Sequence, residues 1–160
     1  MITILTAIQF ADVRDRLVKT IRGIALSKGF SEEEILNIKA DATTLARESN
    51  YLYQGNATRL RLLGTSSEDA VLEIINGLRD YSQTLEIMIV EEELPGFGGR
   101  DLAEIAVRLG HGVLIPLVVS PEYVEQIRAG EQPSSLRNDI VTAFWRAQNE
   151  SGIELSAQSA

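Results

Sequence analysis

The sequence predicts an α/β domain in which a parallel sheet is covered by helices on both faces. Two nearly unbroken apolar runs, residues 85–90 and 114–119, have the length and composition of central strands that are buried on both sides. Segments with helical periodicity alternate with the strand-like segments along the chain. Strands that alternate with helices are joined by crossover connections, which place the strands parallel to one another.

The N-terminal residues 2–7 are rich in β-branched side chains and predict the first strand. Apolar residues then recur at steps of three and four, which predicts a helix that ends at Gly29. The apolar stripe of this helix consists of Phe10, Val13, Leu17, Ile21 and Ile24. Ser31 and Glu34 have the spacing of a capping box, so a second helix is expected over 31–53.

Residues 58–63 predict the second strand, in which Arg59 and Arg61 alternate with leucines and form one polar face. Thr65 and Glu68 then have capping-box spacing and predict the start of the next helix. The side chains expected on the buried face of that helix are Ala70, Val71, Ile74, Ile75 and Leu78.

Three more helices are expected in the second half of the chain. The first lies between the two apolar runs, the second covers 123–129, and the last covers 135–150. The expected buried positions are Leu102, Ile105, Ala106 and Leu109 in the first of these, and Leu136, Ile140, Val141 and Phe144 in the last. We therefore expect a single domain over 1–152, with a helical insertion at about 31–54 and a disordered tail over 153–160.

Composition narrows the classes of function. The chain has no cysteine, which excludes structural disulfides, zinc–thiolate sites and cysteine nucleophiles. A formal net charge of −8 disfavours nucleic-acid binding through a broad basic face. The N-terminus has no basic signal-peptide region, and no window approaches the ~18 apolar residues of a membrane span. We expect a cytoplasmic protein that does not contact a membrane.

A glutamate followed by a glycine-rich turn ends the first apolar run. Glu91 stands four residues before Pro95, and the turn continues through Gly96 and Gly99. This spacing resembles the pattern D-x-x-L-P-G-x-x-G of receiver domains in bacterial response regulators of the chemotaxis-regulator type. The resemblance implies a flavodoxin-like sheet, and it makes Glu91 the equivalent of the aspartate that accepts the phosphoryl group.

Two downstream positions extend the resemblance. Ser120 follows the second apolar run, where a receiver carries the serine or threonine that senses the phosphate. Gln132 precedes Pro133 at the place of the receiver's Lys-Pro pair. The resemblance thus implies that Ser120 is the switch equivalent and that Gln132 occupies the lysine-equivalent position.

The departures from the receiver pattern all affect phosphoryl transfer. A receiver needs an acidic pair after its first strand to hold magnesium, whereas Ile8 and Gln9 stand here and the nearest acid is Asp12. No lysine follows Lys39. Without a metal-binding pair and a lysine, phosphoryl transfer lacks most of its electrostatic support. We therefore expect a degenerate pseudo-receiver without catalysis, cofactor or metal.

Such a module would act in signal transduction, as in two-component systems, through protein–protein interaction. Receivers couple their switch to a face formed by the fourth strand, the helix after it and the last helix. The interface candidates in the matching part of this sequence are Tyr123, Gln126, Ile127, Asn138 and Trp145. We expect a protein partner to bind this face, and a homodimer through it is a second possibility.

Other classes of function stay open at this stage. A ligand- or nucleotide-binding protein or enzyme on a flavodoxin-like sheet would place Glu91, Gly98 and Ser120 at the carboxyl ends of the strands. The glycine spacing, however, matches neither a Walker loop nor a dinucleotide fingerprint. His111 lies between two glycines, which favours a loop residue over a base or metal ligand. A structural subunit of a larger assembly is the third alternative.

A weaker resemblance concerns the residues before the second predicted strand. They are similar to the early part of anti-sigma-factor kinases of the Bergerat ATP-binding class, in which a helix carries an E-L-x-x-N element. Thr44 and Glu48 replace the glutamate and the asparagine of that element here, and the later D-x-G-x-G loop is missing.

Overall fold

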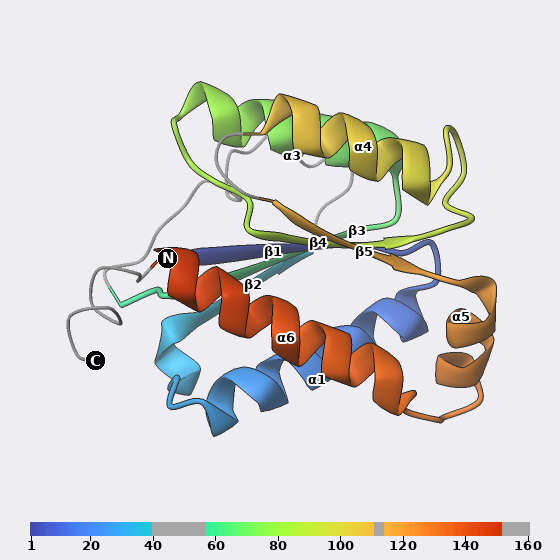
Figure 1. Ribbon diagram of the computed structural model, residues 1–160, viewed down its shortest axis with the longest axis horizontal. Coiled ribbons are helices and arrows are strands. Elements are labelled where there is room, and N and C mark those ends of the chain that lie inside the picture. Colours follow the sequence, from blue (N-terminus) through green and yellow to red (C-terminus); the bar gives the residue numbers. More distant parts are fainter. Residues whose placement is uncertain (40–56, 111–113, 152–160) are drawn as a thin grey trace.

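The fold is built on one five-stranded sheet in which all strands run parallel (Figure 1). The computed structural model describes residues 1–39, 57–110 and 114–151. The strands are β1 (Ile2–Ala7), β2 (Ile35–Lys39), β3 (Leu60–Thr65), β4 (Ile87–Glu91) and β5 (Ile115–Val119), and their order across the sheet is β2-β3-β1-β4-β5. The predicted α/β class with a parallel sheet is confirmed.

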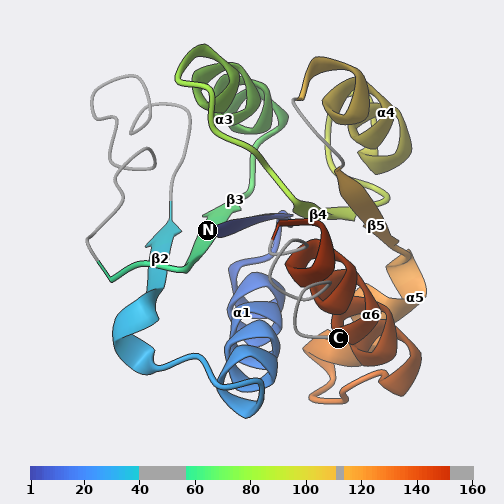
Figure 2. The same ribbon diagram turned by 60° about the vertical axis from the view of Figure 1, so that its left-hand side comes forward.

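Helices cover both faces of the sheet (Figure 2). One layer contains α1 (Ala11–Ser27), α5 (Pro121–Arg128) and α6 (Ser134–Ser151), and the other contains α3 (Glu68–Asp80) and α4 (Gly99–Leu109). Side chains alternate along each strand, so that on β1 Ile4 packs in the core under the first layer and Leu5 in the core under the second. This double burial explains the unbroken apolar runs. No helix in the described part of the chain is long and apolar enough to cross a membrane.

The prediction of a helical insertion over 31–54 is wrong for its first residues, 31–39. The capping box of Ser31 and Glu34 is present, but it begins only a single 3₁₀ turn, Glu32–Glu34. The chain then enters β2, which pairs with β3 from Ile35 opposite Leu60 onward. Pairing with a distant strand supplies the backbone hydrogen bonds that a helix would have supplied, and this competition cannot be read from local spacing. Residues 40–54 of the predicted insertion lie outside the described residues, as does the tail 153–160.

The strand order differs from that of a receiver at the two outer positions. A flavodoxin-like sheet has the order 2-1-3-4-5. The first four positions of this order, 2-1-3-4, correspond here to β3, β1, β4 and β5. β2 is an additional strand outside β3. At the other edge, residues 129–133 connect α5 directly to α6, so the strand numbered 5 in the flavodoxin-like order has no counterpart beside β5. β5 therefore forms one edge of the sheet.

The helix predicted after the second strand is present, with the predicted buried face. Its N-cap is Ser67, whose hydroxyl accepts a hydrogen bond from the backbone N–H of Ala70 at 3.3 Å. The hydroxyl of Thr65 instead accepts from the N–H of Ser67 at 3.2 Å. The predicted cap was therefore two residues early, because β3 continues through Thr65 before the chain turns.

The polar face predicted for 58–63 is also wrong, because Arg61 is fully buried at 0% exposure. Its guanidinium donates hydrogen bonds to the hydroxyl of Thr3 at 2.9 and 3.2 Å, and to the side-chain oxygen of Gln83 at 2.8 Å. Glu86 lies in the same cluster, where its carboxylate accepts from the N–H of Thr3 at 2.8 Å and from the hydroxyl of Thr84 at 2.5 Å. Buried polar groups are tolerated where they find such partners.

Candidate functional site at the carboxyl edge of the sheet

Parallel strands end at the same edge of a sheet, and this edge brings Gln9 and Glu91 together. Gln9 follows β1, and Glu91 is the last residue of the neighbouring strand β4. One carboxylate oxygen of Glu91 accepts a hydrogen bond from the backbone N–H of Gln9 at 2.9 Å, and the other accepts from the Gln9 side-chain amide at 2.6 Å. Glu91 is only 3% exposed. The position that the receiver resemblance would make the phosphoacceptor therefore holds a buried carboxylate whose two oxygens both have neutral donors.

The arrangement supplies few groups for metal or phosphoryl chemistry. A hard cation such as magnesium needs several oxygen ligands, preferably carboxylates. Asp12 lies in the first turn of α1, where its carboxylate is 3.9 Å from the guanidinium of Arg128. Within the described residues, no three His, Cys, Asp or Glu side chains are grouped so that they could hold a metal ion.

The glycine-rich turn after β4 is shaped by close packing. A Cβ atom on Gly99 would lie 2.2 Å from the backbone oxygen of Glu91, so only glycine is accommodated there. Gly96 has a φ of +113°, and a Cβ on it would collide with the carboxylate of Glu68 on α3. That carboxylate accepts a hydrogen bond from the N–H of Phe97 at 2.5 Å, and the N–H of Gly99 donates to Glu92. These two N–H groups already have acceptors, so the turn is a tight connection rather than an open phosphate cradle.

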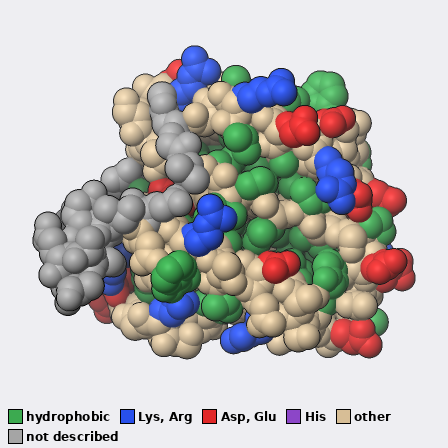
Figure 3. Space-filling view, viewed as in Figure 1, with side chains coloured by type: hydrophobic (Ala, Val, Ile, Leu, Met, Phe, Trp, Pro, Cys, Tyr) green, Lys and Arg blue, Asp and Glu red, His purple; other side chains and the backbone are tan. Residues whose placement is uncertain are grey.

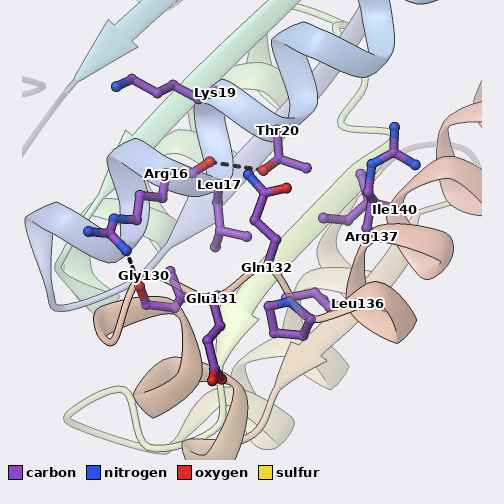
Figure 4. A pocket seen from close by; sticks show the side chains of 12 residues that line it. Arg16, Leu17, Lys19, Thr20, Gly130, Glu131, Gln132, Leu136, Arg137 and Ile140 are labelled. Carbon is purple, nitrogen blue, oxygen red and sulfur yellow. Dashed lines mark hydrogen bonds between the residues drawn. The ribbon is translucent and has the colours of Figure 1, made fainter.

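Ser120 and Gln132 do not contact Glu91. Ser120 is the N-cap of α5, and its hydroxyl accepts from the N–H of Tyr123 at 3.4 Å. Gln132 lies in the loop between α5 and α6, where its side chain lines a groove that opens between α1 and α6 (Figure 4). The receiver resemblance implies three positions, Glu91, Ser120 and Gln132, and the structure does not bring them together into one site.

The interface candidates divide into exposed and buried residues. Asn138 and Trp145 are exposed, and their separation of two helical turns places them on the same face of α6. Gln126 is exposed on α5, whereas Tyr123 is half-buried and its hydroxyl contacts that of Ser135. Ile127 is only 4% exposed and belongs to the core under α1 and α6, so its assignment as an interface residue is wrong. The apolar side of a short helix is the side it buries.

The groove in Figure 4, which has a volume of about 250 Å³, is not apparent from the sequence. Four elements form it: α1, the last turn of α5, the loop 129–133 and α6. Its lining residues are Arg16, Leu17, Lys19, Thr20, Ile127, Gly130, Glu131, Gln132, Pro133, Leu136, Arg137 and Ile140. The only indication of this groove in the sequence is the presence of basic residues among its lining in a chain of negative net charge.

The fold and the site define a doubly wound parallel α/β protein. At the edge where its strands end, the side-chain amide of Gln9 is hydrogen-bonded to the carboxylate of Glu91. No protein-family model matches the sequence, and a comparison with curated proteins finds no relative. Among solved structures, the chain is similar to a de novo designed protein described as having a P-loop NTPase fold. The identity is 12%, the match covers 96% of each chain, and the TM-score is 0.49. The junction from Ala7 to Ala11 in the present chain contains neither the glycines nor the lysine of a Walker loop.

Proposed function

We propose that this protein is a non-catalytic cytoplasmic regulatory module that acts by binding a protein partner. The observation that carries the proposal is the Gln9–Glu91 pair. In an active receiver the corresponding acids hold a cation that prepares the carboxylate for phosphoryl transfer. Here Gln9 stands in that place and directs its backbone N–H and its side-chain amide at the carboxylate of Glu91. An amide cannot neutralise a transferring phosphoryl group as a metal ion does.

A surface with apolar character supports the protein-binding part of the proposal. Figure 3 shows hydrophobic side chains gathered at the centre of one face, over β5 and between α4 and α6. In β5, Pro116 is exposed and its two following neighbours are half-buried. On α6, Trp145 is 57% exposed. Exposed aromatic side chains and contiguous apolar surface are features of protein-interaction sites.

The absence of phosphoryl chemistry can be tested by incubating the protein with acetyl phosphate and magnesium and then measuring its intact mass. We expect no change in mass, while an active receiver domain treated in parallel gains a phosphoryl group. A stable gain of one phosphoryl group that hydroxylamine removes would overturn the proposal, because acyl phosphates are cleaved by hydroxylamine.

The partner can be sought by affinity capture from the native host with wild-type protein and two variants. Trp145→Ala removes the exposed aromatic on α6, and Tyr81→Ala removes an aromatic that is 65% exposed at the end of α3 on the opposite face. We expect one protein to bind saturably to the wild type and to Tyr81→Ala, and to be lost with Trp145→Ala. Light scattering at two concentrations shows whether that partner is a second copy of the chain. Retention of the partner by Trp145→Ala would contradict the assigned surface.

A further inference from the structure

The groove between α1 and α6 combines an apolar floor with a basic rim. Leu17, Leu136 and Ile140 contribute to the floor, and each is at most 4% exposed as a whole residue. The helices therefore pack closely beneath the groove and leave it open only toward the surface. A concave apolar site with a few polar groups at its rim is the usual form of a small-molecule site.

Three cations surround this floor. Arg16 and Lys19 lie on α1, and Arg137 lies on α6, whereas Glu131 is the single acid among the lining residues (Figure 4). The protein as a whole has a net charge of −8, so the local balance is opposite to that of the molecule. Cations that flank a low-dielectric surface attract anions more strongly than isolated surface charges do.

The cations differ in how far they are already engaged. The guanidinium of Arg16 donates a hydrogen bond to the backbone oxygen of Ile127, which fixes its position at one end of the groove. Within the described ranges, neither Lys19 nor Arg137 forms a salt bridge. Figure 4 shows the charged ends of Lys19 and Arg137 directed toward the two outer sides of the groove, so each side chain reaches a ligand by turning over the opening.

We propose that this groove binds a small organic carboxylate whose apolar body is a short alkyl chain or a single ring. The apolar body would cover the floor, and the carboxylate would accept hydrogen bonds from Arg137 or Lys19 after that side chain turns over the opening. A volume of about 250 Å³ suits such a molecule.

The lining of the groove contains neither residue of the Gln9–Glu91 pair, and it does not contain Trp145. The side chain of Gln132 extends over the groove toward Thr20, so the two polar residues line its opening (Figure 4). They can donate to or accept from a second polar group on the ligand. The loop 129–133 that carries Gln132 takes the place of the fifth strand of a receiver, and this direct connection between α5 and α6 is what forms one wall of the groove.

The proposal is tested by titrating the full chain, labelled with ¹⁵N, with octanoate below its micellar concentration and recording amide chemical shifts. Octanol tests the apolar body without the charge, acetate tests the charge without the body, and octylamine reverses the charge. We expect saturable shifts confined to α1, 127–133 and α6 with octanoate, and at least tenfold weaker binding of the other three probes. Equal affinity for octanol, or shifts spread over the whole surface, would overturn the proposal.

Variants locate the binding determinants. Lys19→Ala combined with Arg137→Ala is expected to weaken octanoate binding at least tenfold. The charge-matched control combines Lys28→Ala and Arg108→Ala, two exposed positions outside the groove, and should bind like the wild type. Gln132→Trp, at an exposed loop position, should fill the groove and abolish binding while the protein stays folded by circular dichroism. Unchanged binding by the Lys19/Arg137 double variant or by Gln132→Trp would refute the assigned site.

Discussion

Gln9 donates hydrogen bonds to both carboxylate oxygens of Glu91, although 82 positions separate the two residues in the chain. One donor is the backbone N–H, which is set by the end of β1, and the other is the side-chain amide. Hydrogen bonds to an ionised acceptor are stronger than those between neutral groups. The pair therefore links the central strands β1 and β4 at the edge where a receiver keeps its acidic pocket.

The energy of the Gln9–Glu91 contact is accessible to a double-mutant cycle. We expect Gln9→Ala and Glu91→Ala to couple by about 1–2 kcal/mol, because the cycle isolates the side-chain bond while the backbone N–H of Gln9 is retained in every variant. Urea denaturation at neutral pH provides the four unfolding free energies. A coupling energy within error of zero would show that the side-chain amide contributes nothing.

Gly99 tests the close approach between the glycine turn and β4. Gly99→Ala places a Cβ 2.2 Å from the backbone oxygen of Glu91, and we expect a loss of about 1–3 kcal/mol in unfolding free energy as the backbone shifts. Gly23→Ala is the control, since no atom lies within 4 Å of its Cβ position in α1. This substitution should stabilise the protein by about 0.5–1 kcal/mol. The prediction fails if both substitutions change the thermal midpoint in the same direction.

Arg61 tests the buried polar cluster on the α3 side of the sheet. Arg61→Lys keeps the charge but loses the planar fork that reaches both Thr3 and Gln83, and we expect a loss of about 2 kcal/mol in unfolding free energy. Arg59→Lys is the matched control, because its side chain is 59% exposed and its salt bridge with Glu34 lies at the surface. That control should change stability by less than about 0.5 kcal/mol, measured by urea denaturation. Similar losses in both variants would argue against a special role of Arg61.

Glu86 provides a prediction on pH dependence. Burial raises the pKa of its carboxyl group above the ordinary value of 4.5, and hydrogen bonds from Thr84 and Thr3 together with the charge of Arg61 offset only part of this effect. The folded protein therefore binds the proton more tightly than the unfolded chain does. The resulting stabilisation is present below the unfolded pKa and is lost as pH rises through the folded pKa.

The measurement compares the wild type with Glu86→Gln, which removes this titration. We expect the unfolding free energy of the wild type minus that of the variant to decrease as pH rises from about 4 toward neutrality. Urea denaturation at successive pH values gives this difference directly. A difference that is constant, or that increases with pH, would contradict the raised pKa.

Periodicity in the sequence predicted most helices and strands, because each of them buries either one face or both faces along its whole length. The apolar stripe of α3 and the runs of β4 and β5 follow from which faces each element buries. The glycine-rich turn after β4 was likewise visible in the sequence, and it marked Glu91 as the end of a strand. Local patterns failed at β2, whose residues follow a valid capping box and nevertheless pair with β3.

The candidate site was only partly predictable. The spacing of the glycine-rich turn identifies Glu91 in the sequence. Gln9 is recognisable there only as the residue that replaces an acid, and its contact with Glu91 is visible only in the structure. Sequence position alone does not tell which side of a short helix is buried, and this is why the prediction of Ile127 as an interface residue is wrong. The receiver resemblance stays a prediction, with four strands in a shared order and two outer positions that differ.

The sequence by itself determined the parallel α/β class, the places of the central strands and the lack of a metal-binding acidic pair after β1, because these depend on composition and short-range periodicity. Only the tertiary structure decided that Gln9 closes on Glu91, that Arg61 is buried, and that α1 and α6 place basic side chains around one groove. These features depend on which distant segments meet, and contacts between such segments are set by packing and strand pairing across the whole chain rather than by any local pattern.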